Sequence, residues 1–286
     1  MPIVIHHLTH AYSQAGKLAE AAVSDVSLTI ENGTFLGVIG HTGSGKSTLI
    51  QHLNGLLLPT DGSVAVDGYD TRDKAQRQKA RALVGMVFQY PEYQLFEETV
   101  LQDVSFGPKN LGLPEGDVRE RALAAMRTVG LDPDRFAEKS PFDLSGGEKR
   151  RAALAGILAM QPRYLVLDEP MAGLDPRGRT EILDLIERLR TENGCTIVMV
   201  SHSMDDVARY ADRLLVLSEG RAAMLGTPEE VFARADELMQ MGLDVPQATK
   251  LAMQLTADGM QGLPGGICRM DDLRSLLVER WRTHGK

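Results

Sequence analysis

The sequence is poor in cysteine, in aromatic residues and in long apolar runs. Of its 286 residues, two are Cys, one is Trp and 5% are aromatic. Cys195 and Cys268 are far apart and form no C-x-x-C pair, which argues against a disulfide scaffold or a structural zinc site and fits a reducing cytosol. The longest apolar run, residues 152–160, is much shorter than the roughly 18 residues that cross a bilayer. We therefore expect neither a self-inserting nor a secreted protein, although a soluble subunit docked on a membrane partner stays open.

Positive charge is also scarce. The chain has 31 Lys and Arg against 39 Asp and Glu, which gives a formal net charge of −8. A protein of this balance is not suited to coat nucleic acid, because such binding depends on many cationic contacts that release counterions. Any anion that the chain binds must be held by a local cluster of donors, and we expect no nucleic-acid partner.

Short apolar runs alternate with amphipathic stretches over most of the chain. Most of the runs are apolar on both faces, which is typical of strands in a mainly parallel α/β sheet. The predicted strands are residues 34–39, 83–88, 164–167, 196–200 and 214–217. The predicted helices are residues 47–56, 118–129, 148–159, 177–191 and 204–211.

Two parts of the chain depart from this alternation. Strand-like segments at residues 3–5, 26–30 and 63–66 predict a small antiparallel sheet beside the main one. After Gly226-Thr227-Pro228 the alternation ends, so we predict a main domain at 1–228 and a small C-terminal domain at 229–286. The last segment places four apolar residues on one helical face, which either packs on its own domain or docks on a partner. These residues are Leu273, Leu276, Leu277 and Trp281.

A glycine-rich segment matches the pattern G-x-x-x-x-G-K-[ST] between a predicted strand and a predicted helix. It reads Gly40-His41-Thr42-Gly43-Ser44-Gly45-Lys46-Ser47 and is followed by Thr48. Glycines let successive N–H groups point at a phosphate, and the helix N-terminus adds partial positive charge. We predict that these nine residues bind a nucleotide, with Lys46 on the outer phosphates and the Ser47 hydroxyl on Mg²⁺.

Two adjacent carboxylates follow the apolar run 164–167. Asp168 and Glu169 are placed at the carboxyl end of that predicted strand, where α/β sheets bind ligands. Asp168 could hold Mg²⁺ and Glu169 could polarise an attacking water. An acidic turn after a strand is common, and the motif gains weight from the phosphate loop.

The segment Leu144-Ser145-Gly146-Gly147-Glu148 precedes an apolar helical pattern. Ser145 and Glu148 have the spacing of a capping box, which is a purely structural explanation. The two glycines are not needed for a cap, and they create a second phosphate-binding nest at a helix N-terminus. Both interpretations hold together.

The ordered set of motifs over residues 3–228 resembles the nucleotide-binding subunit of ABC transporters. Gln89 corresponds to the Q-loop glutamine, Asp175 of Ala172-Gly173-Leu174-Asp175 to the D-loop, His202 to the switch histidine and Tyr12 to the aromatic residue that stacks on adenine. The resemblance implies a P-loop NTPase core with a small antiparallel β subdomain and a helical subdomain. It also implies head-to-tail pairing of two subunits around two ATP molecules.

The same resemblance assigns roles to individual residues. Glu169, His202, Gln89 and Lys46 would be catalytic, and Ser47, Gln89 and Asp168 would hold Mg²⁺. Ser145, Gly146, Gly147 and Asp175 would contact the ATP held by the partner subunit. Three features depart from the usual family pattern: Glu148 replaces a glutamine, Met171 stands where a small hydroxyl residue is common, and the Ala172-Gly173 pair lacks the serine common in the D-loop.

Further stretches are similar to the ATPases of energy-coupling factor importers, most of all to the second of the two paired ATPases. They include His41-Thr42, residues 51–56, residues 88–100 and Met241-Gly242-Leu243-Asp244. This resemblance implies uptake of vitamins or transition-metal ions through separate membrane subunits, and a position on the cytoplasmic face of the cell membrane. The implied partners are a related ATPase, more readily a heterodimer than a homodimer, a substrate-binding membrane component, and a membrane coupling component that docks near Gln89–Val100.

Two other hypotheses are open from sequence alone. A non-transport ABC ATPase associated with nucleic acid or ribosomes is disfavoured by the acidic balance and the single cassette. A nucleotide-sensing module that binds without hydrolysis is disfavoured by the presence of Glu169 and His202. We therefore expect an ATP hydrolase coupled to transport.

Overall fold

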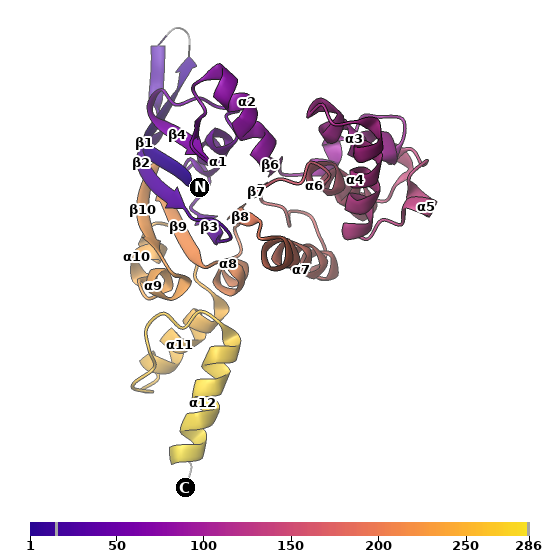
Figure 1. Ribbon diagram of the computed structural model, residues 1–286. Coiled ribbons are helices and arrows are strands. Elements are labelled where there is room, and N and C mark those ends of the chain that lie inside the picture. The colour runs from indigo at the N-terminus through magenta and orange to yellow at the C-terminus, as the bar shows by residue number, and fades with distance from the viewer. Residues whose placement is uncertain (15–16, 285–286) are drawn as a thin grey trace.

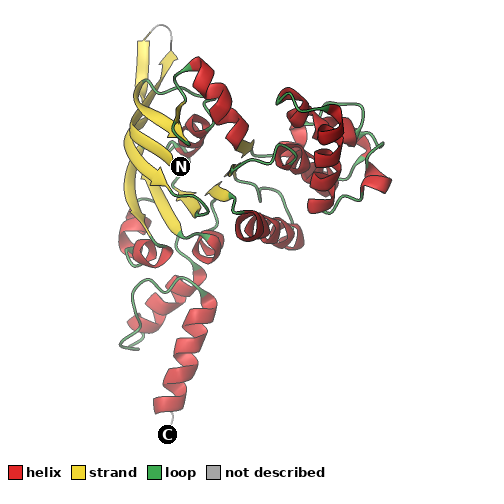
Figure 2. Ribbon diagram, viewed as in Figure 1, coloured by secondary structure: helices red, strands yellow, loops and turns green. Residues whose placement is uncertain are grey.

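The fold is given by a computed structural model that describes residues 1–14 and 17–284. Two β-sheets occupy one side of the molecule, and a lobe made only of helices lies apart from them (Figure 2). A pair of helices at the C-terminal end projects away from both parts (Figure 1). Within the described residues, no helix has the length and apolar character needed to cross a membrane.

The larger sheet has six strands in the order β10-β9-β3-β8-β7-β6. Its strands are β3 (Phe35–Ile39), β6 (Val84–Val87), β7 (Tyr164–Asp168), β8 (Thr196–Val200), β9 (Arg213–Ser218) and β10 (Arg221–Gly226). All neighbours pair in parallel except β9 and β10. The predicted mainly parallel α/β sheet is thus confirmed, including the five strands predicted within it.

The strands of this sheet are apolar throughout because both faces are buried. In β7, Tyr164 and Val166 pack into one core with the smaller sheet and α1 (Lys46–Leu53), whereas Leu165 and Leu167 pack into the core on the other face. That second core includes the helices α7 (Pro176–Asn193) and α8 (Met204–Tyr210). A strand that serves two cores cannot show the alternation of a half-exposed strand.

The smaller sheet is antiparallel, in the order β2-β1-β4-β5. Its strands are β1 (Ile3–Gln14), β2 (Lys17–Ile30), β4 (Asp61–Val66) and β5 (Tyr69–Asp70). β1 and β2 are much longer than the predicted segments 3–5 and 26–30. Their pairing has repeated register shifts between Ile5 and Ser13, and β-bulges of this kind interrupt the alternation that marks a strand in sequence.

The helical lobe is inserted between β6 and β7 and follows the short helix α2 (Lys74–Leu83). It contains α3 (Val100–Asn110), α4 (Glu115–Thr128), α5 (Pro133–Phe136), α6 (Gly146–Leu158) and the 3-10 helices η1 (Pro91–Gln94) and η2 (Pro141–Asp143). α6 begins two residues before the predicted range 148–159, because Ser145 and Glu148 form the complete capping box that their spacing predicts.

The C-terminal residues divide between two cores. The helices are α9 (Pro228–Phe232), α10 (Ala235–Gln240), α11 (Gln247–Ala257) and α12 (Met270–His284). Phe232 and Leu238 belong to the larger core, so α9 and α10 are continuous with the rest of the molecule. Only α11 and α12 form a small core of their own, around Ala248 and Leu273. On the apolar stripe predicted for α12, Leu273 is buried whereas Trp281 is 76% exposed.

Candidate functional site

The loop between β3 and α1 has a backbone that only glycine allows at several positions. Gly43 and Gly45 have φ angles of 83° and 97°, in the left-handed region. A Cβ at Gly45 would lie 2.3 Å from the carbonyl oxygen of Ala22, and one at Gly40 would lie 2.4 Å from that of Leu217. The loop is therefore fixed in a tight curve that wraps the N-terminus of α1, as the sequence pattern predicts for a phosphate loop.

Lys46 lies inside this curve. Its Nζ donates to the carbonyl oxygens of Gly40, at 2.7 Å, and His41, at 3.0 Å. Burial lowers the pKa of Lys46, and the nearby charges of Glu169 and Asp168 oppose this shift. A cation that is poorly solvated and held by two neutral carbonyls is ready to pair with an anion.

The two carboxylates lie at the carboxyl end of β7. Asp168 is buried, and this burial raises its pKa, with a further contribution from the charge of Glu169. A hydrogen bond with the side chain of Ser47 acts in the opposite direction. The structure therefore brings Ser47, Lys46 and Asp168 together from two different elements.

Both carboxylate oxygens of Glu169 contact side chains that follow the two neighbouring strands. Gln89, after β6, donates from Nε2 to Oε2 of Glu169 at 3.0 Å. His202, after β8, places Nε2 2.7 Å from Oε1 of the same carboxylate. Because β6, β7 and β8 are parallel neighbours, their carboxyl ends deliver these three side chains to one point. Glu169 itself has a φ of 48°, an unusual conformation for a residue other than glycine.

Tyr12 lies over the start of α1, with its ring partly exposed. Its hydroxyl is 3.1 Å from Oγ1 of Thr48. Its ring meets the ring of His10 edge-on at 4.7 Å, and His10 in turn meets His52 at 4.7 Å. His10 could not be predicted as a neighbour of Tyr12 from sequence, because a histidine in a strand with bulges carries no motif. The structure ties Tyr12 to the phosphate-loop helix through Thr48.

The second glycine nest lies on the helical lobe. Ser145 donates from Oγ to Glu148 at 2.7 Å and from its backbone N–H to the same carboxylate oxygen at 2.8 Å, and these bonds lower the pKa of Glu148. A Cβ built at Gly146 or Gly147 would meet no atom within 4 Å. Within the described ranges 1–14 and 17–284, no hydrogen bond or ion pair joins residues 145–147 to residues 40–48. The nest is thus open and does not complete the phosphate loop of its own chain.

Asp175 caps α7 by accepting a hydrogen bond from the backbone N–H of Gly178 at 2.7 Å. Its side chain is therefore engaged in its own chain.

Met171 lies four residues before Asp175. It is half-buried against the larger core, which explains how an apolar residue is accommodated at this position.

Comparisons with known proteins agree with this geometry. The family model described as ABC transporter matches residues 23–172. The chain belongs to the ABC transporter family. It is 56% identical, over 98% of both chains, to the energy-coupling factor transporter ATP-binding protein EcfA2 of Symbiobacterium thermophilum.

Solved structures of ABC ATPases share the fold. One is cbiO1 from Clostridium perfringens, described as part of the ABC transporter complex cbiONQ, with 37% identity and a TM-score of 0.72 over 88% of this chain and 98% of that one. Another is the dimeric post-hydrolysis state of the ATP-binding cassette MJ0796 with ADP and Pi, with 29% identity and a TM-score of 0.70 over 79% of this chain and 98% of that one.

The residues of this ABC ATPase site fit ATP. The Ser44 hydroxyl is buried in the phosphate loop without a hydrogen-bond partner among the described residues, so the loop has unused polar capacity as well as a buried cation. The described residues contain no group of three His, Cys, Asp or Glu side chains suited to a metal. Ser47 and Asp168, with Gln89 as the third predicted ligand, offer only a few hard oxygen ligands, which suits Mg²⁺ because this ion usually takes its other ligands from substrate phosphates and water.

Proposed function

We propose that this chain is the ATP-hydrolysing subunit of an energy-coupling factor importer, which splits ATP to ADP and phosphate to drive uptake through separate membrane subunits. One observation carries the proposal. Glu169 lies beside Asp168 and the buried Lys46, and both of its carboxylate oxygens are engaged by Gln89 and His202. A carboxylate held in this way has a fixed direction and suits a general base that must orient a water molecule.

Each residue of the site then has a defined task in this proposal. Lys46 leaves its two carbonyl partners to bind the outer phosphates, and the N–H groups of residues 40–48 bind the remaining phosphate oxygens. Glu169 takes the proton of the attacking water, while His202 and Gln89 hold the carboxylate in place. Ser47, Gln89 and Asp168 would hold Mg²⁺, which would neutralise phosphate charge. Tyr12 covers the adenine with its exposed ring.

The open nest at Ser145, Gly146 and Gly147 supports pairing with a second ATPase. These residues have no nucleotide contact to make in their own chain, and their backbone N–H groups lie at the N-terminus of α6. We propose that they contact the ATP bound by a related partner subunit, and that Asp175 lies close to the interface between the two subunits. A heterodimer fits better than a homodimer, because the relatives are named as one numbered member of a set. The C-terminal residues 229–286, with Trp281 exposed, would add a further contact between the two ATPases.

The segment Gln89–Val100 supports docking of a membrane component. It exposes aromatic rings, with Tyr93 85% exposed, beside Glu92, Glu97 and Glu98. A groove of about 950 Å³ starts at this segment and continues between α2, α3 and α6, where Leu95, Phe106 and Met160 line it. The charged residues that line the groove are Lys79, Arg81 and Asp103, so the acidic side chains that an amphipathic helix with basic residues would meet are the glutamates of the neighbouring segment. Docking there would hold the chain at the cytoplasmic face of the membrane.

The proposal is tested by replacing Glu169 with Gln in the complex assembled with its partners. Gln keeps the shape and the hydrogen-bond acceptor but cannot take a proton, so ATP should still bind while turnover falls by about 100-fold or more. Binding is measured by isothermal titration and turnover by phosphate release. Unchanged turnover would remove Glu169 as the base. A complex that assembles on ribosomes or nucleic acid instead of a membrane protein would reject the transport role.

A further inference from the structure

One buried arginine connects the docking segment to the catalytic loop. Arg150 lies on α6, one turn after Ser145, and is only 4% exposed. Its Nη1 donates to the carbonyl oxygen of Ala172 at 2.8 Å, and its Nε donates to Oε2 of Glu92 at 3.3 Å. Glu92 is 58 residues away in sequence and Ala172 is 22 away. The guanidinium therefore links α6, which carries it, to two other segments at once: the docking segment and the loop after Glu169.

The contact with Ala172 reaches the proposed base. The backbone N–H of Ala172 donates to the carbonyl oxygen of Glu169 at 3.1 Å, so residues 169–172 form one tight turn. Glu169 already has a left-handed backbone, which the surrounding contacts must hold in place. If Arg150 moved, the carbonyl group of Ala172 would move with it. This movement would alter the turn at residues 169–172 and change the direction of the Glu169 carboxylate.

The contact with Glu92 reaches the surface. Glu92 lies in η1 between Tyr90 and Tyr93, and its side chain is 20% exposed. A cationic group of a docked helix can therefore reach this carboxylate and compete with Arg150 for it. At 3.3 Å the present bond is longer than most charge-assisted hydrogen bonds, so it is open to such competition.

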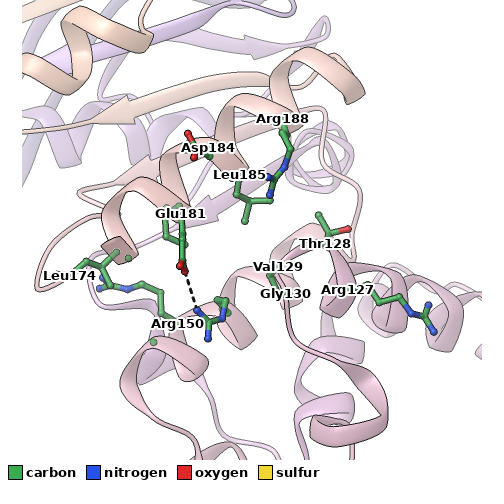
Figure 3. Close-up of a pocket in the computed structure, with 14 residues that line it drawn as sticks. Arg127, Thr128, Val129, Gly130, Arg150, Leu174, Glu181, Asp184, Leu185 and Arg188 are labelled. Carbon is green, nitrogen blue, oxygen red and sulfur yellow. Dashed lines mark ion pairs between the residues drawn. The ribbon is translucent and has the colours of Figure 1, made fainter. Parts of the chain in front are cut away.

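A cavity on the other side gives Arg150 room to respond. Its Nη2 is buried and has no partner among the described residues, although a buried guanidinium is normally satisfied. Arg150 also lines a cavity of about 560 Å³ between the helical lobe and α7, together with Glu181 and Asp184 (Figure 3). The side chain thus has a spare donor and borders free space, whose other charged lining residues are Arg127, Arg151, Arg188, Glu181 and Asp184, with Glu181 already paired with Arg151.

We propose that Arg150 is a positioning residue that relays docking at Glu92 to the catalytic turn that begins at Glu169. When a cationic partner group takes up Glu92, Arg150 keeps Ala172 and turns its free donor toward the cavity, and the turn shifts with it. This inference rests on the proposed docking of a membrane component at Gln89–Val100. It adds the route by which docking changes hydrolysis.

The test uses the full chain with its partner ATPase, with and without the membrane component. The variants are Arg150→Lys, which keeps the charge but cannot bridge both acceptors, Glu92→Gln, and the double variant. Arg151→Gln is the matched control, because Arg151 is the next residue on α6 and pairs with Glu181 at 3.7 Å instead. Phosphate release gives kcat, KM for ATP and the factor by which the membrane component changes kcat. Co-purification reports assembly.

We expect both single variants to lower this factor about fivefold or more, with KM within about twofold and with assembly retained. The double variant should be no worse than Arg150→Lys, because both changes cut the same link. Arg151→Gln should keep the factor of the wild type. A retained factor in Arg150→Lys, additive losses, or an equal loss in Arg151→Gln would overturn the relay. A wild-type complex that does not assemble would instead reject the docking proposal, on which the relay depends.

Discussion

Nε2 of His202 lies 2.7 Å from Oε1 of Glu169, close enough for the imidazole to donate a hydrogen bond to the carboxylate. The two side chains come from neighbouring parallel strands, so the sheet itself fixes their separation. With Gln89 on the other oxygen, both carboxylate oxygens have a partner, which restrains rotation of the group. This arrangement joins the predicted switch histidine directly to the proposed base.

His202→Ala should lower kcat for ATP hydrolysis by about 100-fold, because loss of one fixed partner lets the carboxylate of Glu169 turn away from the water. KM for ATP should stay within about twofold. Phosphate release in the assembled complex measures both. His202→Gln, which can still donate a hydrogen bond, is the control and should recover part of the loss. A similar defect in both variants would mean that hydrogen bonding to Glu169 is not the role of His202.

Asp168→Asn should make the folded chain more stable at neutral pH. Burial raises the pKa of Asp168, so its ionised form is disfavoured in the folded state. The wild-type carboxyl therefore weakens the fold above its raised pKa and has no such effect when protonated, below its ordinary pKa of about 3.9. The gain in the free energy of unfolding should be largest above the raised pKa and shrink as the pH falls toward the ordinary pKa of the carboxyl.

Urea unfolding at several pH values measures this gain, with nucleotide and Mg²⁺ left out. Asp212→Asn serves as a comparison, because Asp212 forms an ion pair with Arg190 and should lose stability on substitution. A gain for Asp168→Asn that is independent of pH would contradict the electrostatic explanation.

Tyr12→Ala should weaken ATP binding to the full chain. Stacking of an aromatic ring on a base contributes about 1–3 kcal/mol when measured by alanine substitution, so we expect a clear loss in affinity. Tyr12→Phe keeps the ring and removes only the contact of the hydroxyl with Thr48. It should bind much better than Tyr12→Ala. Titration with ATP and with inorganic triphosphate separates the two ends of the ligand, because triphosphate binding should be the same in all three proteins.

Glu148→Ala should destabilise α6 by about 0.5–2 kcal/mol, the usual range for a lost cap. The carboxylate accepts from both the N–H and the hydroxyl of Ser145, and both donors would lose their partner. Glu148→Gln keeps an acceptor oxygen and should lose less. Hydrogen exchange of the first turn of α6 provides the measurement. Equal protection in the wild type and Glu148→Ala would show that the cap does not hold this helix.

The central sheet and the phosphate site were predictable from sequence for physical reasons. Strands such as β7 are apolar on both faces, and the glycines of residues 40–45 permit a left-handed curve that residues with a side chain rarely adopt. The rule that parallel strands share one carboxyl edge also predicts that Gln89, Glu169 and His202 lie together. This prediction needs no information on distant contacts. These parts of the structure depend on local sequence and on one general rule of sheet topology.

Other features depend on contacts that no local pattern encodes. The length of β1 and β2 is hidden by bulges. α9 and α10 attach to the larger core through Phe232 and Leu238. In sequence, these two apolar residues could equally belong to the core of a separate domain. Arg150 appears in sequence as one of three basic residues in a row, and only the folded chain distinguishes it from Lys149 and Arg151. The division of roles between Ser145 and its partner subunit is likewise a proposal from family pattern and exposure.

The left-handed backbone of Glu169 creates a trade-off between thermal stability and turnover at this residue. Such a conformation costs on the order of 1 kcal/mol or more for a residue with a side chain, and glycine would relieve it. Selection of variants for heat resistance alone would therefore favour Glu169→Gly, which lacks the proposed base. Engineering for higher thermal stability of this ATPase should therefore keep Glu169 and change other positions.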